Sequence, residues 1–369
     1  MIFRKAKNAV AVAILAATPL LTVLTPGIAH ALPGAYCEWT GAGSDAKWST
    51  VANWTNVGGG SANCSSSAAP GAGDDLVFPT DTATSWSPIN DLTAGTSFNS
   101  ITFSGTGGTH PFDITGSSIT LAGDLTDTSD QGNVIENDVA ITGSTTVNVA
   151  NQVDLKVGGT VSGSGSITKT GNGDAVMRTL TLTGALTING GMFTSQANSS
   201  ADLTVSSVAI VSGATFAYNP FDFSSTATYT IAKPITTAGT INFSTVGSAV
   251  GTNDTVNITG TMTLTGNASI VAVDGETVNI QGPLHGPGFV LGASTGSVVN
   301  QSTDNTTDTP SGELVPAASS SDGSDGTTAP DTGFALVSAH PGVTLAITLA
   351  AAGALFGAAQ LSRKASARR

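Results

Sequence analysis

The sequence predicts an all-β fold, a right-handed parallel β-helix (β-solenoid), and three observations lead to this prediction. The chain has 369 residues, of which only 10% are charged and 45 are Gly, and Ser and Thr make up roughly a quarter of it. Short runs in which apolar residues alternate with Thr recur from about residue 97 to residue 298. Between these runs, glycines recur at intervals of about 20 to 29 residues.

The alternating runs are expected to be strands with one buried and one solvated face. Examples are residues 118–121 (SITL), 181–183 (TLT) and 256–259 (VNIT). The β-branched residues Thr, Val and Ile favour strands, and a period of two places successive side chains on opposite faces. Gly-containing turns separate the runs, as expected for short strands.

The spacing of the glycines indicates a repeat that corresponds to one turn of a solenoid. An immunoglobulin-type β-sandwich, which also has short strands and frequent turns, is the alternative fold. We expect the solenoid over residues 97–300. The glycines that define the spacing are Gly123, Gly143, Gly163, Gly184, Gly213, Gly239, Gly260 and Gly282.

The N-terminus carries the three parts of a secretory signal. Basic residues within 4–7 precede an apolar run over 9–24, and Ala29 and Ala31 offer small side chains at the positions that a signal peptidase reads. We therefore expect a signal peptide over residues 1–31, cut after Ala31. A retained membrane anchor is the alternative, although the apolar run is short for one.

The C-terminus carries a second ordered set of signals over residues 329–369. An apolar run of about 19 residues, 343–361, is long enough to cross a bilayer as a helix. The basic tail 363–369 follows, and basic residues stay on the cytoplasmic side. A pentapeptide precedes the run, and its residues are Ala329, Pro330, Asp331, Thr332 and Gly333.

This order of pentapeptide, apolar span and basic tail resembles the sorting signal of sortase substrates, whose motif is LPxTG. The resemblance implies that sortase cuts between Thr332 and Gly333 and joins Thr332 to an amine of the cell-wall peptidoglycan. Ala329 stands where the family usually has Leu, which leaves open the sortase class that accepts it. An ordinary single-span membrane protein is the alternative. Residues 301–328, rich in Ser, Thr, Asp and Gly, are expected to form a disordered stalk.

One segment of the expected solenoid resembles the autotransporter-associated β-strand repeat of bacterial surface proteins. Residues 163–173 read GSGSITKTGNG, and the runs 180–184 (LTLTG) and 186–191 (LTINGG) follow. The match covers about 30 residues and occurs once, and residues 174–177 interrupt it. The family forms parallel β-helices, so the resemblance supports a solenoid and names no ligand.

Residues 32–96 differ from the rest, and we call them the tryptophan module. Three of the four Trp residues, Trp39, Trp48 and Trp54, lie within 16 residues. The module resembles a segment that opens many repetitive bacterial surface proteins. The three indoles are expected to form a cap that covers the open end of the solenoid. The alternative is a carbohydrate platform, with these aromatics facing a ligand.

Both cysteines of the chain, Cys37 and Cys64, fall in the tryptophan module. An even count in an exported chain predicts one disulfide. Two free buried thiols are the alternative. A zinc site is not expected, because two Cys without a nearby His make too few ligands.

The sequence offers little catalytic chemistry, and we assign no catalytic residue. His110 and His285 lie in apparent turns, and no nucleophilic serine motif stands between a strand and a helix. The acidic residues Asp124, Asp127 and Asp130 lie at intervals of three, and Asp74 and Asp75 are adjacent. Calcium would suit such carboxylates, but neither group has a known calcium-loop spacing. We therefore expect no bound metal, with calcium as the alternative.

Charge narrows the location and the partners. Seven of the 12 Lys and Arg residues lie in the first or last seven positions, so residues 32–332 hold five basic and 25 acidic residues. This excludes nucleic acid as a partner and disfavours anionic glycans. We expect a non-enzymatic adhesin or presentation rod on a bacterial cell wall, with sortase and peptidoglycan as partners and a host, a cell or a neutral glycan as ligand. The alternatives are a wall-attached polysaccharide lyase or hydrolase and a purely structural coat protein.

Overall fold

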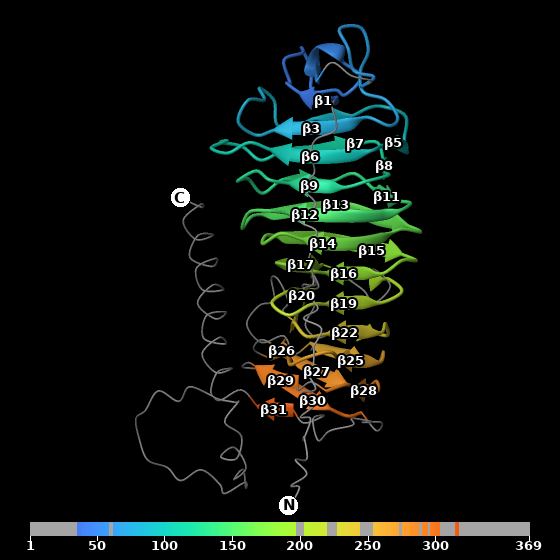
Figure 1. Cartoon of the computed structure of the whole chain (residues 1–369), viewed down its shortest axis with the longest axis vertical. Helices are drawn as coiled ribbons and strands as arrows, with labels where there is room; N and C mark the ends of the chain where they lie inside the picture. Colours follow the sequence, from blue (N-terminus) through green and yellow to red (C-terminus); the bar gives the residue numbers. More distant parts are fainter. Residues whose placement is uncertain are drawn as a thin grey trace, which may run out of the picture. The chain divides into compact units, whose positions relative to one another are not determined.

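The computed structural model describes residues 35–58, 62–196, 203–219, 227–243, 254–272, 275–287, 290–293, 296–302 and 314–316. In these residues the chain winds into a parallel β-solenoid of about nine turns, which confirms the predicted fold class. Strands of successive coils stack in sequence order along one axis, from blue β1 to orange β31 (Figure 1). The β-sandwich alternative is wrong here, because every described strand pair except β1 with β2 is parallel or an isolated bridge.

Sheet 1 has 12 strands and forms one face of the solenoid. Its single antiparallel pair lies at the N-terminal end, where β2 is the terminal strand. In spatial order it contains β2 (Trp54–Val57), β1 (Tyr36–Trp39), β3 (Asp75–Pro79), β6 (Ser100–Ser104), β9 (Leu125–Asp127), β12 (Ser144–Val149), β14 (Ser166–Thr170), β16 (Leu186–Ile188), β19 (Val208–Ile210), β22 (Ile235–Thr237), β25 (Met262–Leu264) and β28 (Leu284–His285).

Sheet 2 has 15 strands and bends around an edge of the solenoid. Its main path contains β4 (Ile89–Asn90), β7 (Asp113–Gly116), β10 (Val134–Ile135), β13 (Asp154–Gly163), β15 (Asp174–Leu182), β17 (Met192–Ser195), β20 (Thr215–Tyr218), β23 (Thr240–Phe243), β26 (Ala268–Ala272), β29 (Val290–Ala293) and β31 (Leu314–Pro316). A side branch contains β5 (Thr96–Phe98), β8 (Ile119–Leu121), β11 (Val139–Ile141) and β18 (Leu203–Thr204).

Sheet 3 has four strands, β21 (Thr228–Ile231), β24 (Thr255–Ile258), β27 (Thr277–Ile280) and β30 (Ser297–Asn300). The one described helix is the short 3₁₀ turn η1 (Val51–Asn53). Equivalent positions in neighbouring coils are between 19 and 27 residues apart, as hydrogen bonds between coils show. The coil length that the sequence predicts is therefore confirmed.

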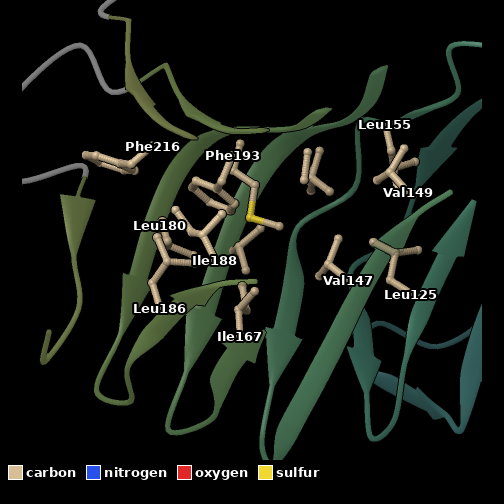
Figure 2. Packing of buried hydrophobic residues seen from close by; sticks show 14 of the residues in the cluster. Leu125, Val147, Val149, Leu155, Ile167, Leu180, Leu186, Ile188, Phe193 and Phe216 are labelled. Carbon is tan, nitrogen blue, oxygen red and sulfur yellow. The ribbon is translucent and has the colours of Figure 1, made fainter. Parts of the chain in front are cut away.

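Alternate side chains of each strand point into the solenoid and stack on their equivalents in the next coil. Leu125 lies opposite Val147, and Ile167 lies opposite Leu186. All four are at most 3% exposed, and they line the interior together in Figure 2. Burying one such side chain contributes about 1.5–3 kcal/mol, so the interior stack is the main source of stability.

The glycines that suggested the repeat occupy two corners of the coil, not one column as a single spacing implies. Gly213 and Gly239 come before β20 and β23 of sheet 2. Gly163 ends β13, and its neighbour Gly165 takes the corner position. The remaining five come just before strands of sheet 1, and they are Gly123, Gly143, Gly184, Gly260 and Gly282.

Two predicted boundaries need correction. The boundary between residues 96 and 97 falls inside β5, and β1 and β3 of the tryptophan module already belong to sheet 1. The solenoid therefore begins within the module, because its strands stack on the next coil. At the other end β31 lies inside the expected stalk 301–328 and pairs with β29.

Several predictions fall on residues that the structure does not describe. They are the signal peptide with Ala29 and Ala31, most of the stalk, and the sorting signal over 329–369. In the described part of the chain, no helix is long and apolar enough to cross a membrane.

Candidate functional site

The three clustered tryptophans of the module are buried at the N-terminal end of the solenoid. Trp39 and Trp48 are 0% exposed and Trp54 is 5% exposed. The indole of Trp54 meets those of Trp39 and Trp48 edge to face, with ring centroids 5.1 and 5.7 Å apart. Phe78 of β3 lies 5.7 Å from both Trp48 and Trp54, so the cluster continues into the core of the first coils.

The prediction that Trp39, Trp48 and Trp54 face a ligand is wrong. Their rings are used in packing, and the Trp54 Nε1 donates to the carbonyl of Trp48 at 2.9 Å. Buried rings offer no face on which a sugar can stack. The fourth tryptophan, Trp86, is the more exposed one, and its ring lies 4.5 Å from that of His110.

The predicted disulfide joins Cys37 of β1 to Cys64. It ties the loop after β2 to sheet 1, and the separation of 27 residues makes the closed loop long enough to restrict the unfolded chain substantially. The same loop is held by the carboxylate of Asp74, which accepts hydrogen bonds from the backbone N–H groups of Asn63 and Gly71, both at 2.8 Å.

A groove of about 540 Å³ lies at this end of the molecule. Its lining carries no charge and mixes small apolar side chains with hydroxyl groups and one amide. The buried Oδ1 of Asn56 has no hydrogen-bond partner among the described residues. The lining residues are Val51, Ala52, Trp54, Thr55, Asn56, Ser65 and Ser66.

The acidic residues singled out in the sequence hold neighbouring segments and do not converge on one point. Asp124 accepts from the N–H of Thr146 in the next coil at 2.7 Å, and Asp130 accepts from Gly107 at 2.7 Å. Asp75 accepts from Asn99 and Ser100 of the next coil. No group of three His, Cys, Asp or Glu side chains in the described ranges could hold a metal ion.

Asp127 is the buried member of this set. Its Oδ1 accepts from the N–H and the hydroxyl of Ser129, and its Oδ2 accepts from the amide of Asn133 at 2.8 Å. Burial raises the pKa of this carboxyl to about 6, although these hydrogen bonds act in the opposite direction. All three donors belong to one turn, so the cluster shapes that turn.

Lys169 and Asp174 form the second buried polar pair, in the segment that resembles the autotransporter-associated repeat. Lys169 follows Ile167 at an inward position of β14 and is 0% exposed. Its Nζ donates to the carbonyl oxygens of Thr170, Gly171 and Gly190, at 2.6, 3.1 and 3.3 Å. The lysine therefore joins two neighbouring coils at a corner.

Burial shifts the pKa of both groups toward their neutral forms. It lowers the pKa of Lys169 to about 8, with Asp174 acting in the opposite direction. It raises the pKa of Asp174 to about 7. The Oδ2 of Asp174 accepts from the hydroxyl of Thr194 at 2.8 Å. Sequence analysis missed this pair, although the alternation of residues 166–170 places Lys169 on the inward face.

The two histidines lie far apart in the coil order. His110 follows β6 and is exposed, whereas His285 is in β28, near the last coil. No known protein family, curated protein or solved structure matches the chain. Its function therefore has to be inferred from the sequence signals and the geometry described above.

Proposed function

We propose that the chain is a bacterial cell-wall surface protein whose solenoid presents an adhesive surface. The observation that carries the proposal is the architecture: a parallel solenoid stands between an N-terminal segment with the pattern of a secretory signal and a C-terminal segment with the pattern of a sorting signal. A solenoid lengthens by one rung with each coil, so it suits display at a distance from the cell.

The tryptophan module acts in this proposal as the N-terminal cap. A solenoid end exposes strand edges and core side chains, which would otherwise promote aggregation. The buried indoles of Trp39, Trp48 and Trp54 cover the apolar interior of the first coil, and the disulfide fixes the loop beside them.

Anchoring follows from the C-terminal signals. The apolar span 343–361 holds the exported chain in the membrane, and the residues before it form a polar stalk that reaches the wall. Sortase breaks the peptide bond between Thr332 and Gly333, and the carbonyl of Thr332 forms a new amide with an amine of peptidoglycan. The span and the basic tail leave with Gly333.

The distribution of acids favours presentation over catalysis. A polysaccharide lyase or hydrolase on this scaffold needs several carboxylates in one groove. The acids described above accept hydrogen bonds from neighbouring segments instead, and the groove at the N-terminal end is lined by uncharged residues. The high acidic charge keeps such rods apart and soluble at a crowded surface.

The test compares cells that make the wild-type chain with cells that make Thr332→Ala. Attachment of the cells to a panel of host cells and neutral glycans is measured, together with the amount of chain in wall and medium. We expect wild-type cells to attach and Thr332→Ala cells to lose attachment as the chain leaves the wall fraction. Equal attachment by both, with the wild-type chain in the wall, would reject the adhesive role.

A further inference from the structure

The strand β2 is the last strand of sheet 1 at the N-terminal end, and one of its edges has no neighbouring strand among the described residues. It pairs antiparallel with β1, with Trp54 opposite Trp39 and Thr55 opposite Glu38. All later coils lie on the other side of β1 (Figure 1). The free edge of β2 therefore forms the tip of the described rod.

The alternation of an antiparallel ladder tells which backbone groups point outward. The N–H of Thr40 donates to the carbonyl of Asn53 at 2.8 Å, so this pair is hydrogen-bonded. Two residues along, Thr55 and Glu38 form the next hydrogen-bonded pair. The backbone groups of Trp54 and Asn56 therefore point away from β1, and the Trp54 N–H is already bonded to Val51. This leaves the Trp54 carbonyl and both backbone groups of Asn56 at the free edge.

The groove of about 540 Å³ runs beside this edge, with Ser65 and Ser66 on its opposite side. The amide Nδ2 of Asn56 donates to the carbonyls of Ala62 and Cys64, at 3.3 and 2.9 Å. Its Oδ1 is buried without a partner, although buried acceptors are rarely left unpaired. The groove thus offers an unsatisfied acceptor in addition to the strand edge.

Edge strands usually carry features that block the addition of another strand, such as a Lys, a Pro or a bulge. The sequence of β2 is Trp-Thr-Asn-Val, which contains none of these residues, and its register with β1 runs without a bulge. The opposite side of the groove is fixed by the disulfide Cys37–Cys64. A preformed groove loses little conformational entropy when a ligand binds.

We propose that this groove binds an extended, positively charged segment of another protein, which adds to sheet 1 as a strand beside β2. Main-chain hydrogen bonds give such binding its affinity. Positive charge is favoured because residues 32–332 hold five basic and 25 acidic residues, and Glu38 lies directly across the ladder from Thr55. A second copy of this chain is a poorer occupant, because it repeats the same acidic charge. The inference rests on the proposed adhesive function and names the class of partner.

The test measures fluorescence anisotropy of a labelled synthetic peptide in which Lys alternates with Val, added to the purified full-length chain in detergent. Two control peptides carry N-methyl groups along one edge or Glu in place of Lys. Ser65→Trp fills the groove, and Ser67→Trp is the matched control, since Ser67 is an exposed residue of the same loop that does not line the groove. Both variants are checked for unchanged thermal unfolding.

We expect the Lys peptide to bind the wild type and Ser67→Trp alike, and Ser65→Trp to weaken binding at least about tenfold. Both control peptides should also bind at least about tenfold more weakly. The proposal is overturned if Ser65→Trp binds as the wild type does, if N-methylation has no effect, or if no binding occurs at about 1 mM peptide. Self-association that Ser65→Trp abolishes would identify a second copy as the occupant and would also overturn it.

A cell assay separates this inference from the proposed function. If cells with Ser65→Trp attach as the wild type does, the adhesive role stands and the groove is not its site. If wild-type cells do not attach at all while the peptide binds the purified chain, the groove stands and the adhesive role fails.

Discussion

Gly165 gives the sharpest test of how the coils stack. It occupies the corner before β14, where a Cβ would lie 2.1 Å from the carbonyl oxygen of Gly143 and 2.5 Å from the Cγ2 of Ile141. Both atoms belong to the preceding coil, so Gly165→Ala forces the two coils apart by more than 1 Å before ordinary contact is restored. Neither the backbone of Gly143 nor the buried side chain of Ile141 can move aside easily.

The expected cost follows from what this displacement breaks. Two hydrogen bonds cross the corner, from the Gly165 N–H to Ile141 at 3.0 Å and from the Ser166 N–H to Gly143 at 3.1 Å. Each contributes about 1 kcal/mol, and overpacking at such a site costs about 1–3 kcal/mol. We therefore expect Gly165→Ala to lower the free energy of unfolding by about 3 kcal/mol.

Gly143 is the matched control, because it occupies the corresponding corner one coil earlier. A Cβ there would lie 3.8 Å from its nearest neighbour, the carbonyl oxygen of Ala122, and its φ is not positive. Gly143→Ala should leave stability unchanged or raise it by about 0.5 kcal/mol. Urea unfolding followed by far-UV circular dichroism compares the variants. Equal stability of Gly165→Ala and Gly143→Ala would refute the close stacking of the coils.

Three further predictions concern the charged pair, the disulfide and the aromatic cluster. Because burial raises the pKa of Asp174 from 3.8 to about 7, Asp174→Asn should stabilise the chain by roughly 2 kcal/mol at pH 8 and by nothing below pH 4, in urea melts across this range; a pH-independent difference would contradict this. Replacing Cys37 and Cys64 with Ser should lower stability by about 3 kcal/mol, and reduction of the wild type should match it. Trp54→Ala should cost about 3–5 kcal/mol and raise dye binding to exposed apolar surface, whereas Trp86→Ala should change both less.

The fold was predictable because alternation is a local property of the sequence. Residues 118–121 contain β8, residues 181–183 overlap the end of β15, and residues 256–259 overlap β24. Each inward position of these strands carries Ile, Leu or Val, and the interior accepts little else. The coil length was predictable for the same reason, since each coil repeats the same turns.

The roles of single residues were less predictable, because they depend on contacts between coils. An aromatic residue has the same letter whether it packs inward or faces a ligand, so the burial of Trp39 and Trp48 needed the structure. Asp124 and Asp130 lie close in sequence, but their carboxylates bond to different coils. The glycine spacing mixed two corners because both need residues without a Cβ.

Lys169 shows where a local rule held and its consequence was missed. Its inward position follows from the alternation of β14, but a charged side chain in the interior needs partners. These partners are three carbonyl oxygens at a corner, which are formed by two coils and invisible in a linear reading.

The account as a whole depends on attachment of this solenoid to the cell wall, and one measurement tests it most directly. Walls purified from cells that make the chain are digested with muramidase and a protease, and the released peptides are identified by mass spectrometry. We predict a peptide that ends at Thr332 and carries a peptidoglycan fragment on its carboxyl group. Recovery of the chain from the membrane fraction intact through Arg369, with no such peptide in the wall, would contradict the account.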